Sequence, residues 1–174
     1  MLPSARKNFF EDKKDYDPLL LQLLYNRGLK KKEDIDHFLQ ADFDAGYDPF
    51  LLPFMKEAVN LTIKHIKQGT KICIYGDYDA DGITSSALLF SLLGSIGAKA
   101  EVYIPDRVTE GYGLNKEAIK EVKDQGSGLI ITVDSGIRNK QEVEYARDLG
   151  LDVLITDHHI PPEKKRRSSA MSYY

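Results

Sequence analysis

The sequence has one cysteine and no tryptophan among its 174 residues. A single cysteine excludes an internal disulfide and a cysteine-rich zinc site. The position of Cys73 within an apolar run favours a small buried side chain over a reactive thiol. Long hydrophobic runs are also missing: none approaches the length of a membrane span, and the N-terminus lacks the apolar core of a secretory signal. We therefore expect a cytoplasmic protein without a membrane partner.

A strong excess of charge of either sign is absent too. The 24 Lys and Arg residues nearly balance the 27 Asp and Glu residues, and the formal net charge is -3 at pH 7. Nucleic-acid binding would therefore need a local basic groove, because the chain as a whole offers no electrostatic attraction. The composition is that of a globular protein, 42% hydrophobic and 29% charged, and the length fits one domain or one domain with a helical extension.

The first 70 residues predict a helical extension. Residues 1–16 are polar and irregular, and we expect them to be loosely held. Apolar residues at helical spacing follow. They predict three helices, over residues 18–26, 32–39 and 53–68, with a connecting loop at 40–52. His37 and His65 fall on these helices without a metal-type partner four residues away, so we interpret both as ordinary surface or boundary residues.

From residue 71 to residue 160, strands and helices alternate. Strands are predicted over 71–75, 99–104, 129–133 and 152–156, and helices over 83–96, 115–125 and 140–149. The strands are continuously apolar, which predicts an α/β fold: a parallel sheet with helices on both faces and right-handed crossovers. The helix at 83–96 is apolar nearly all round and should be the most buried. Asn139 with Glu142 predicts a reciprocal cap for the last helix.

An acidic turn follows the first predicted strand. Asp77, Asp79 and Asp81 lie between Gly76 and Gly82. Three like charges within five residues repel one another, and a hard divalent cation such as Mg2+ or Mn2+ would offset that repulsion. Alone, the turn could equally be a solvated acidic loop.

Each of the other three predicted strands also ends beside an acidic residue. These ends read Pro105-Asp106-Arg107, Asp134-Ser135-Gly136 and Asp157-His158-His159. Because the carboxyl ends of parallel strands meet at one edge of a sheet, these side chains should converge there. Carboxylates with imidazoles suit Mn2+, and a two-metal carboxylate site is built for phosphoryl transfer.

Several neighbours could contact a substrate at this edge. Arg107 could bind a phosphate as a fork, or it could make a structural ion pair. Asp106 could be a ligand or could orient Arg107. Tyr112 could stack on a base or simply pack, and the glycines around it allow close backbone approach, as does the Ser135-Gly136 turn.

Four motifs in order resemble those of the DHH phosphoesterase superfamily, most closely its RecJ-like single-stranded-DNA-specific exonucleases. The motifs are Tyr-Gly-Asp-Tyr-Asp-Ala-Asp-Gly-Ile-Thr-Ser (75–85), Pro-Asp-Arg-Val-Thr-Glu-Gly-Tyr-Gly-Leu (105–114), Thr-Val-Asp-Ser-Gly-Ile (132–137) and Thr-Asp-His-His (156–159). The helical lead-in is similar too, and the resemblance covers roughly residues 17–163.

The resemblance implies a role for each matching residue. It implies metal ligands at Asp79, Asp81 and His158, a bridging ligand at Asp134, and His159 facing the scissile phosphate. Asp77 and Asp157 would be either ligands or groups that orient them. The candidates for substrate contact, Arg107, Tyr112, Gly113, Ser135 and Gly136, rest on their position at this edge and not on the resemblance. Tyr75 stands where many superfamily members have a histidine, which argues against a pyrophosphatase-type site.

The same resemblance implies an activity. It is Mn2+- or Mg2+-dependent hydrolysis of single-stranded DNA from 5′ to 3′, releasing 5′-mononucleotides in DNA repair and recombination. Single-strand-binding protein and a helicase are the implied protein partners. The family's catalytic domain continues past the last strand with a further aspartate ligand and a second domain, so we expect this chain to be the N-terminal catalytic part, with a disordered tail at 161–174.

Other functions fit the same residues. One is a DHH phosphodiesterase of short oligonucleotides or cyclic dinucleotides, and another is an inactive DHH fragment that serves as a binding module. A receiver-type or flavodoxin-type module would explain an acidic strand edge but leaves the paired histidines unexplained.

Overall fold

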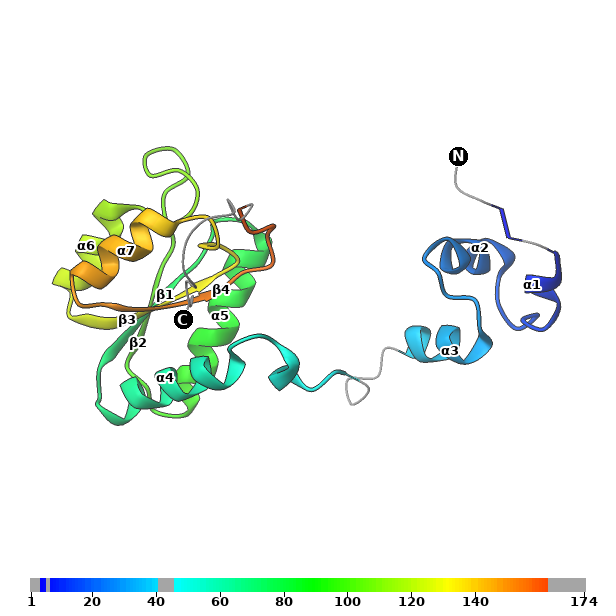
Figure 1. The fold of residues 1–174 in the computed structure, drawn as a ribbon, viewed down its shortest axis with the longest axis horizontal. Helices are drawn as coiled ribbons and strands as arrows, with labels where there is room; N and C mark the ends of the chain where they lie inside the picture. Colours follow the sequence, from blue (N-terminus) through cyan, green and yellow to red (C-terminus); the bar gives the residue numbers. More distant parts are fainter. Residues whose placement is uncertain (1–3, 6, 41–45, 163–174) are drawn as a thin grey trace, which may run out of the picture. The chain divides into compact units, whose positions relative to one another are not determined.

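The computed structural model describes residues 4–5, 7–40 and 46–162 (Figure 1). Packing divides the chain into two compact units, Met1–Leu51 and Leu52–Tyr174. Most of the predicted tail, residues 163–174, lies outside the described residues, as does the part of the predicted loop at 41–45. Among the described helices, none is long and apolar enough to cross a membrane.

The first unit contains short helices around a small core. Its elements are α1 (Lys7–Glu11), α2 (Pro18–Asn26), α3 (Lys32–Gln40) and the 3-10 turn η2 (Pro49–Leu51). Asp17 caps α2 by accepting the N–H groups of Leu19 and Leu20. The expectation of an irregular segment at 1–16 was wrong for α1, because Phe9 is buried against Tyr25, with ring centroids 5.0 Å apart.

The second unit is built on a four-stranded sheet. Its strands are β1 (Lys71–Tyr75), β2 (Ala100–Tyr103), β3 (Ser127–Val133) and β4 (Asp152–Thr156), all parallel and in the order β2-β1-β3-β4. The predicted parallel sheet is therefore confirmed. β3 begins two residues earlier than predicted, because Ser127 pairs with Lys71 ahead of a register shift.

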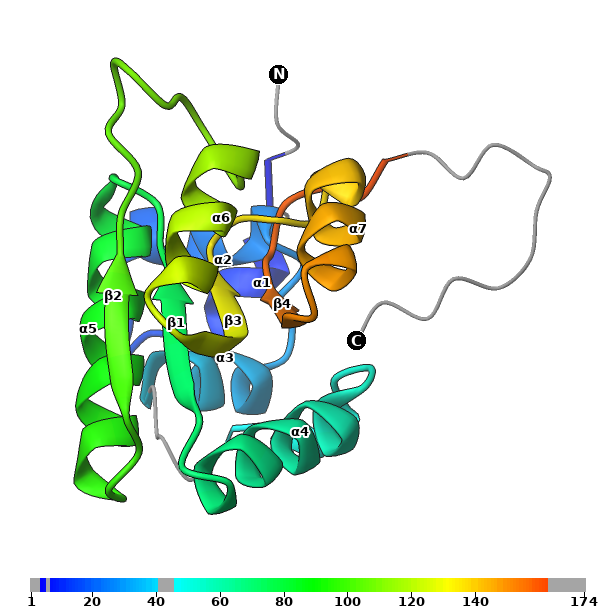
Figure 2. The ribbon, with the colours of Figure 1, turned by 90° about the vertical axis from the view of Figure 1, so that its left-hand side faces the viewer.

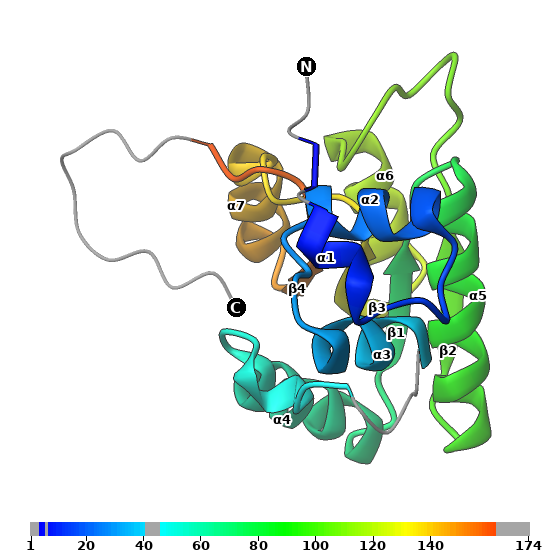
Figure 3. The same cartoon turned by 90° about the vertical axis from the view of Figure 1, so that its right-hand side faces the viewer.

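Helices cover both faces of this sheet, as predicted (Figures 2 and 3). One face packs against α4 (Met55–Lys67) and α5 (Ala80–Ser95), and the other against α6 (Lys116–Asp124) and α7 (Lys140–Asp148). The alternation along β1 explains the division, since Ile72 and Ile74 join the first core while Cys73 and Tyr75 join the second. Because α4 packs on the sheet, it belongs to the second unit, whereas the sequence suggested a boundary at residue 70.

Two predictions about these helices were wrong. The helix expected to be the most buried, α5, buries only Gly82, Ser86 and Leu93, and Leu88 is 74% exposed. The reason is that α5 packs on β1, β2 and β3 through one side, and the side that carries Leu88 is exposed. The predicted cap of α7 does not form: Asn139 makes no capping hydrogen bond to the backbone, and its side chain instead donates to the carbonyl of Leu114 at 3.1 Å and to the carboxylate of Glu142 at 3.4 Å.

The strand order creates a crevice between β1 and β3. The connection from β1 leads outward to β2, and the connection from β3 leads outward in the other direction to β4. The first connection contains α5 and the second contains α7, and these helices lie on opposite faces. Such a reversal separates the loops at the carboxyl ends of the two central strands and is where open α/β sheets bind ligands.

Candidate metal centre

The loop after β1 is held by the start of α5. Asp79 is the N-cap of α5, and its Oδ1 accepts the N–H of Gly82 at 2.9 Å. Asp77 is buried, and its Oδ1 accepts the N–H of Tyr78 at 2.7 Å. A Cβ on Gly82 would lie 2.5 Å from the backbone of Asp77, so only glycine lets the helix begin this close. Both carboxylates therefore lie at the positive end of α5.

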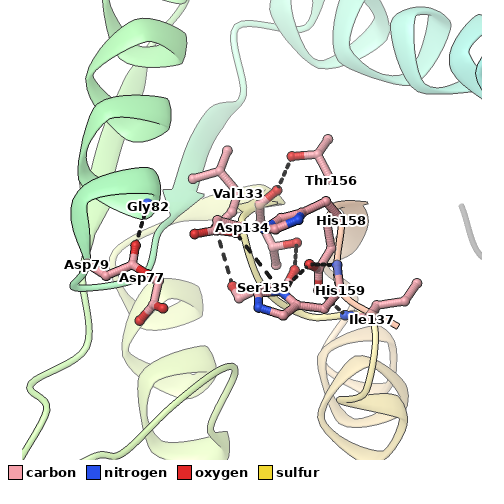
Figure 4. A network of polar contacts seen from close by, with 12 residues as sticks. Asp77, Asp79, Gly82, Val133, Asp134, Ser135, Ile137, Thr156, His158 and His159 are labelled. Carbon is pink, nitrogen blue, oxygen red and sulfur yellow. Dashed lines mark hydrogen bonds and ion pairs between the residues drawn. The ribbon is translucent and has the colours of Figure 1, made fainter. Parts of the chain in front are cut away.

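Asp134 follows β3 in a left-handed backbone conformation, with φ 59°. Aspartate is among the few residues that tolerate this region. Its N–H still donates to the carbonyl of Thr156 at 3.0 Å, which continues the pairing with β4. The side chain is buried and lies between the aspartates of the first loop and the histidines that follow β4 (Figure 4).

The segment after β4 is organised by Asp157. One carboxylate oxygen accepts the N–H of Ile137 at 3.0 Å. The other accepts the N–H of His159 at 2.9 Å and lies 2.7 Å from Nδ1 of the same residue. His158 points elsewhere, with its Nε2 3.0 Å from Oδ1 of Asp134. Asp157 thus orients His159, while His158 faces Asp134.

The pKa shifts of these groups differ in sign. Burial and the nearby carboxylate of Asp79 raise the pKa of Asp134, and the proximity of His158 only partly counters them. Burial also acts to raise the pKa of Asp157, but the hydrogen bonds from His159 and Ile137 outweigh it and lower that pKa. The hydrogen bond to Asp157 raises the pKa of His159.

The side chains form two groups that share Asp134. Within each group, one ligand atom per residue lies within 4.8 Å of the others. The groups are Asp77, Asp79 and Asp134, and Asp134, His158 and His159. Two ligands on opposite sides of a Mg2+ ion at about 2.1 Å each are about 4.2 Å apart, so a small closure would bring either group onto a cation.

One buried oxygen atom also indicates that a cation would bind here. Oδ1 of Asp134 has no hydrogen-bond partner among the described residues, although His158 Nε2 is within ion-pair distance. A buried carboxylate oxygen left without a donor is costly, and a cation would satisfy it. Oxygen ligands with imidazole nitrogens suit a hard or borderline divalent ion such as Mn2+. The donor set therefore fits the metal that the sequence predicts.

Asp81 and Arg107 lie at the rim of this centre. Asp81 is exposed in the first turn of α5, outside both groups, and lines a cavity of about 310 Å³ together with Asp134 and His158. The guanidinium of Arg107 lies over the ring of Tyr78, 5.1 Å from its centroid, next to the acidic loop. Asp106 closes its own turn by accepting the N–H groups of Val108 and Thr109.

The remaining predicted substrate residues have different surroundings in the structure. The hydroxyl of Tyr112 lies 3.3 Å from His159 Nδ1 and donates to the carbonyl of Asp134 at 3.3 Å. Ser135 is buried, and its hydroxyl donates to the carbonyl of Val133 at 3.4 Å, so it faces the backbone. Gly136 and Gly113 both have positive φ; Gly136 lines a smaller cavity beside Tyr112, and Gly113 packs against Asn139.

The roles of three residues near the site were missed in the sequence. Tyr75 is fully buried and donates its hydroxyl to the carbonyl of Gly113 at 3.1 Å, so it supports the loop that carries Tyr112. Glu110 anchors the same loop by accepting the hydroxyl of Tyr103 at 2.6 Å. Arg138, which follows the third motif, lines the smaller cavity. The only sequence signal for Arg138 was a basic residue in the turn after Gly136.

Comparison with known proteins agrees with this geometry. Residues 71–174 match the DHH family, N-terminal domain. The single-stranded-DNA-specific exonuclease RecJ of Bacillus subtilis is 47% identical over 144 residues, which is 83% of this chain and 18% of that protein. The RecJ of Escherichia coli is 36% identical over 150 residues, 83% of this chain and 24% of that protein. This chain thus spans less than a quarter of the length of these relatives.

Solved structures of RecJ also resemble this chain. RecJ from Thermus thermophilus in complex with Mn2+ is 30% identical, with a TM-score of 0.69 over 93% of this chain and 23% of that one. A second structure, exonuclease RecJ bound to manganese, is 40% identical, with a TM-score of 0.60 over 66% of this chain and 30% of that one. The resemblance that the four motifs predicted is therefore confirmed. The chain belongs to the DHH family.

Proposed function

We propose that this chain contributes a metal-dependent phosphodiesterase site that acts on single-stranded DNA. The observation that carries the proposal is the position of Asp134, a buried carboxylate shared by two groups of ligand atoms, with one oxygen that accepts no hydrogen bond from the described residues. An arrangement of this kind is suited to two neighbouring cations and to in-line displacement at phosphorus. The names of the RecJ relatives support the choice of substrate.

Some side chains of the site would hold the metal, and others would orient the phosphate. Asp77, Asp79, Asp134 and His158 would hold Mn2+ or Mg2+, with Asp81 as a further ligand from the cavity wall. When bound, the metal would polarise the phosphoryl oxygen and activate water. Asp157 and Tyr112 contact Nδ1 of His159, which leaves Nε2 to contact a phosphate oxygen.

Substrate contacts would come from the neighbouring loops. Arg107, already aligned over Tyr78, would bind phosphate, and the half-exposed ring of Tyr112 would stack on a base. The backbones of Gly113, Ser135 and Gly136 allow close approach. Family resemblance alone supports 5′ to 3′ release of 5′-mononucleotides, a cytoplasmic role in repair and recombination, and single-strand-binding protein and a helicase as partners.

The replacement Asp134→Asn tests this proposal. With Mn2+, the chain should release mononucleotides from end-labelled single-stranded DNA, and EDTA should abolish the release. Asp134→Asn removes a charge that both groups share, so activity should fall at least 100-fold and calorimetric Mn2+ binding should weaken in parallel. Asp124→Asn is the matched control, because Asp124, on the exposed end of α6, forms an ion pair with Lys120 and lies outside both groups of ligand atoms.

Two results would contradict the proposal. Absence of Mn2+ binding by the native chain would favour a binding module over an enzyme. Hydrolysis of dinucleotides without hydrolysis of long single strands would favour a phosphodiesterase of short oligonucleotides.

A further inference from the structure

A second, smaller cavity opens beside the candidate metal centre at the start of α7. Its volume is about 110 Å³, and its walls include Tyr112, Gly136, Arg138, Asp157 and His159. Asp157 also lines the larger cavity, so the two cavities adjoin. Pockets for drug-sized ligands are usually about 300 to 1,000 Å³, so this one suits a small group rather than a whole nucleoside.

Arg138 gives this cavity a positive rim. Its Nε donates to the carbonyl of Ile160 at 3.0 Å, which fixes the plane of the guanidinium. Within the described part of the chain, no residue accepts a hydrogen bond from its other N–H groups. A planar fork of free donors matches the oxygens of a phosphate. The positive charge also acts on His159 across the cavity.

The acidic wall of the cavity does not cancel this attraction. The side chain of Asp157 is only 2% exposed, and three N–H donors already surround its oxygens. Gly136, with φ 104°, forms another part of the wall, and a Cβ there would lie 2.9 Å from Oγ1 of Thr132. The groups that remain available to a ligand are therefore the Arg138 fork, the Tyr112 ring and the edge of His159.

We infer that this cavity is a phosphate subsite in which Arg138 binds a phosphate of the substrate next to the one that is cleaved. The chemical class of the ligand is a phosphate mono- or diester. That the ester belongs to single-stranded DNA rests on the proposed function, whereas the phosphate site itself does not. Arg138 would act on binding rather than on the chemical step.

Inorganic phosphate tests the subsite without any nuclease activity. NMR of the full metal-free chain should give saturable shifts of the Arg138 Nε–H and Gly136 N–H signals. Arg138→Gln should weaken this binding at least tenfold, and Arg138→Lys should restore only part of it, because lysine keeps the charge without the fork. Arg147→Gln, at the exposed end of α7, removes the same charge and should leave the affinity unchanged. No saturable shift in the native chain, or an equal loss in both glutamine variants, would overturn the inference.

Binding of an unlabelled dT oligomer in EDTA links the subsite to the substrate. For single strands, each phosphate contact contributes about -0.7 to the slope of log K against log salt. Arg138→Gln should therefore reduce the slope by about 0.7, and Arg147→Gln should not. Phosphate binding at Arg138 without any DNA hydrolysis would sink the proposed function and leave the subsite intact. Hydrolysis by the native chain with no change in slope for Arg138→Gln would sink the subsite alone.

Discussion

At the scale of single residues, the carboxylates of the site differ in how much of their hydrogen-bonding capacity the protein already uses. Asp157 accepts three N–H donors, and Asp79 caps a helix. Asp134 instead keeps a buried oxygen that accepts no hydrogen bond from the described residues, although His158 Nε2 lies 3.0 Å from it. Its left-handed backbone turns the carboxylate into the crevice while the N–H stays paired to β4. Availability to a cation therefore follows from the backbone conformation as well as from the residue type.

Tyr112→Phe tests how His159 is positioned. The variant loses two hydroxyl contacts of 3.3 Å, to His159 Nδ1 and to the carbonyl of Asp134. Contacts of this length are worth about 0.5–1.5 kcal/mol together, so kcat for single-stranded DNA should fall about 2- to 10-fold with little change in thermal stability. Tyr145→Phe, in a half-buried tyrosine of α7, is the control. Equal kinetics for both variants would remove Tyr112 from this role.

At the scale of elements, the junction between β1 and α5 places two of the carboxylates. Gly82→Ala would bring a Cβ within 2.5 Å of the backbone of Asp77, so the helix must move away. We expect a loss of about 1–3 kcal/mol in unfolding free energy, measured in urea, and weaker Mn2+ binding in calorimetry. Gly94→Ala on the same helix would place its Cβ in open space among the described residues outside the adjoining helix backbone, and should stabilise α5 by up to about 1 kcal/mol. If Gly82→Ala is as stable as Gly94→Ala, the close start of α5 is not required.

The same junction marks what local sequence can predict. Strand ends and the acidic residues that follow them were predictable because turn residues and apolar periodicity are local signals. The start of α5 was predicted at residue 83, whereas the helix begins at Ala80, with Asp79 as its cap. The exposure of Leu88 was not predictable. An apolar helix sequence shows that the helix could be buried, but whether another element covers it depends on the rest of the fold. The side chain of Asn139 likewise donates to the carbonyl of Leu114, a tertiary contact, as well as to Glu142 of its own helix, and it does not cap the backbone of α7. Convergence of the carboxylates was predicted, but the strand order that places Asp134 beside Asp77 was not.

At the scale of the second unit, the candidate site lies at the carboxyl end of the sheet and an ion pair lies at its amino end. His65 of α4, expected at the surface or boundary, is instead buried and lies 2.9 Å from Asp152, the first residue of β4. Lys64 lies 3.2 Å from the same carboxylate. This contact ties α4 to the amino end of the sheet. The polar contact that holds α4 on the sheet and the carboxylates of the candidate metal centre therefore lie at opposite ends of the strands.

Acid should weaken that contact. Burial acts to raise the pKa of Asp152, but hydrogen bonds from His65 and Lys64 outweigh it and hold the pKa below its usual range. A carboxyl group with a lowered folded-state pKa adds stability above the unfolded value of about 3.9, and this is lost as pH falls through the folded value. The side chain is 45% exposed, so solvent screening limits the effect to less than about 1 kcal/mol.

Asp152→Asn isolates this contribution from the other carboxylates. In urea unfolding from pH 7 to pH 3, the variant should be less stable than the native chain above about pH 5, and the two curves should converge toward pH 3. Asp124→Asn, which breaks an exposed pair within α6, should run close to the native curve throughout. Curves for Asp152→Asn and the native chain that stay parallel down to pH 3 would mean that the charge of Asp152 does not hold α4 on the sheet, and that apolar packing of α4 alone does so.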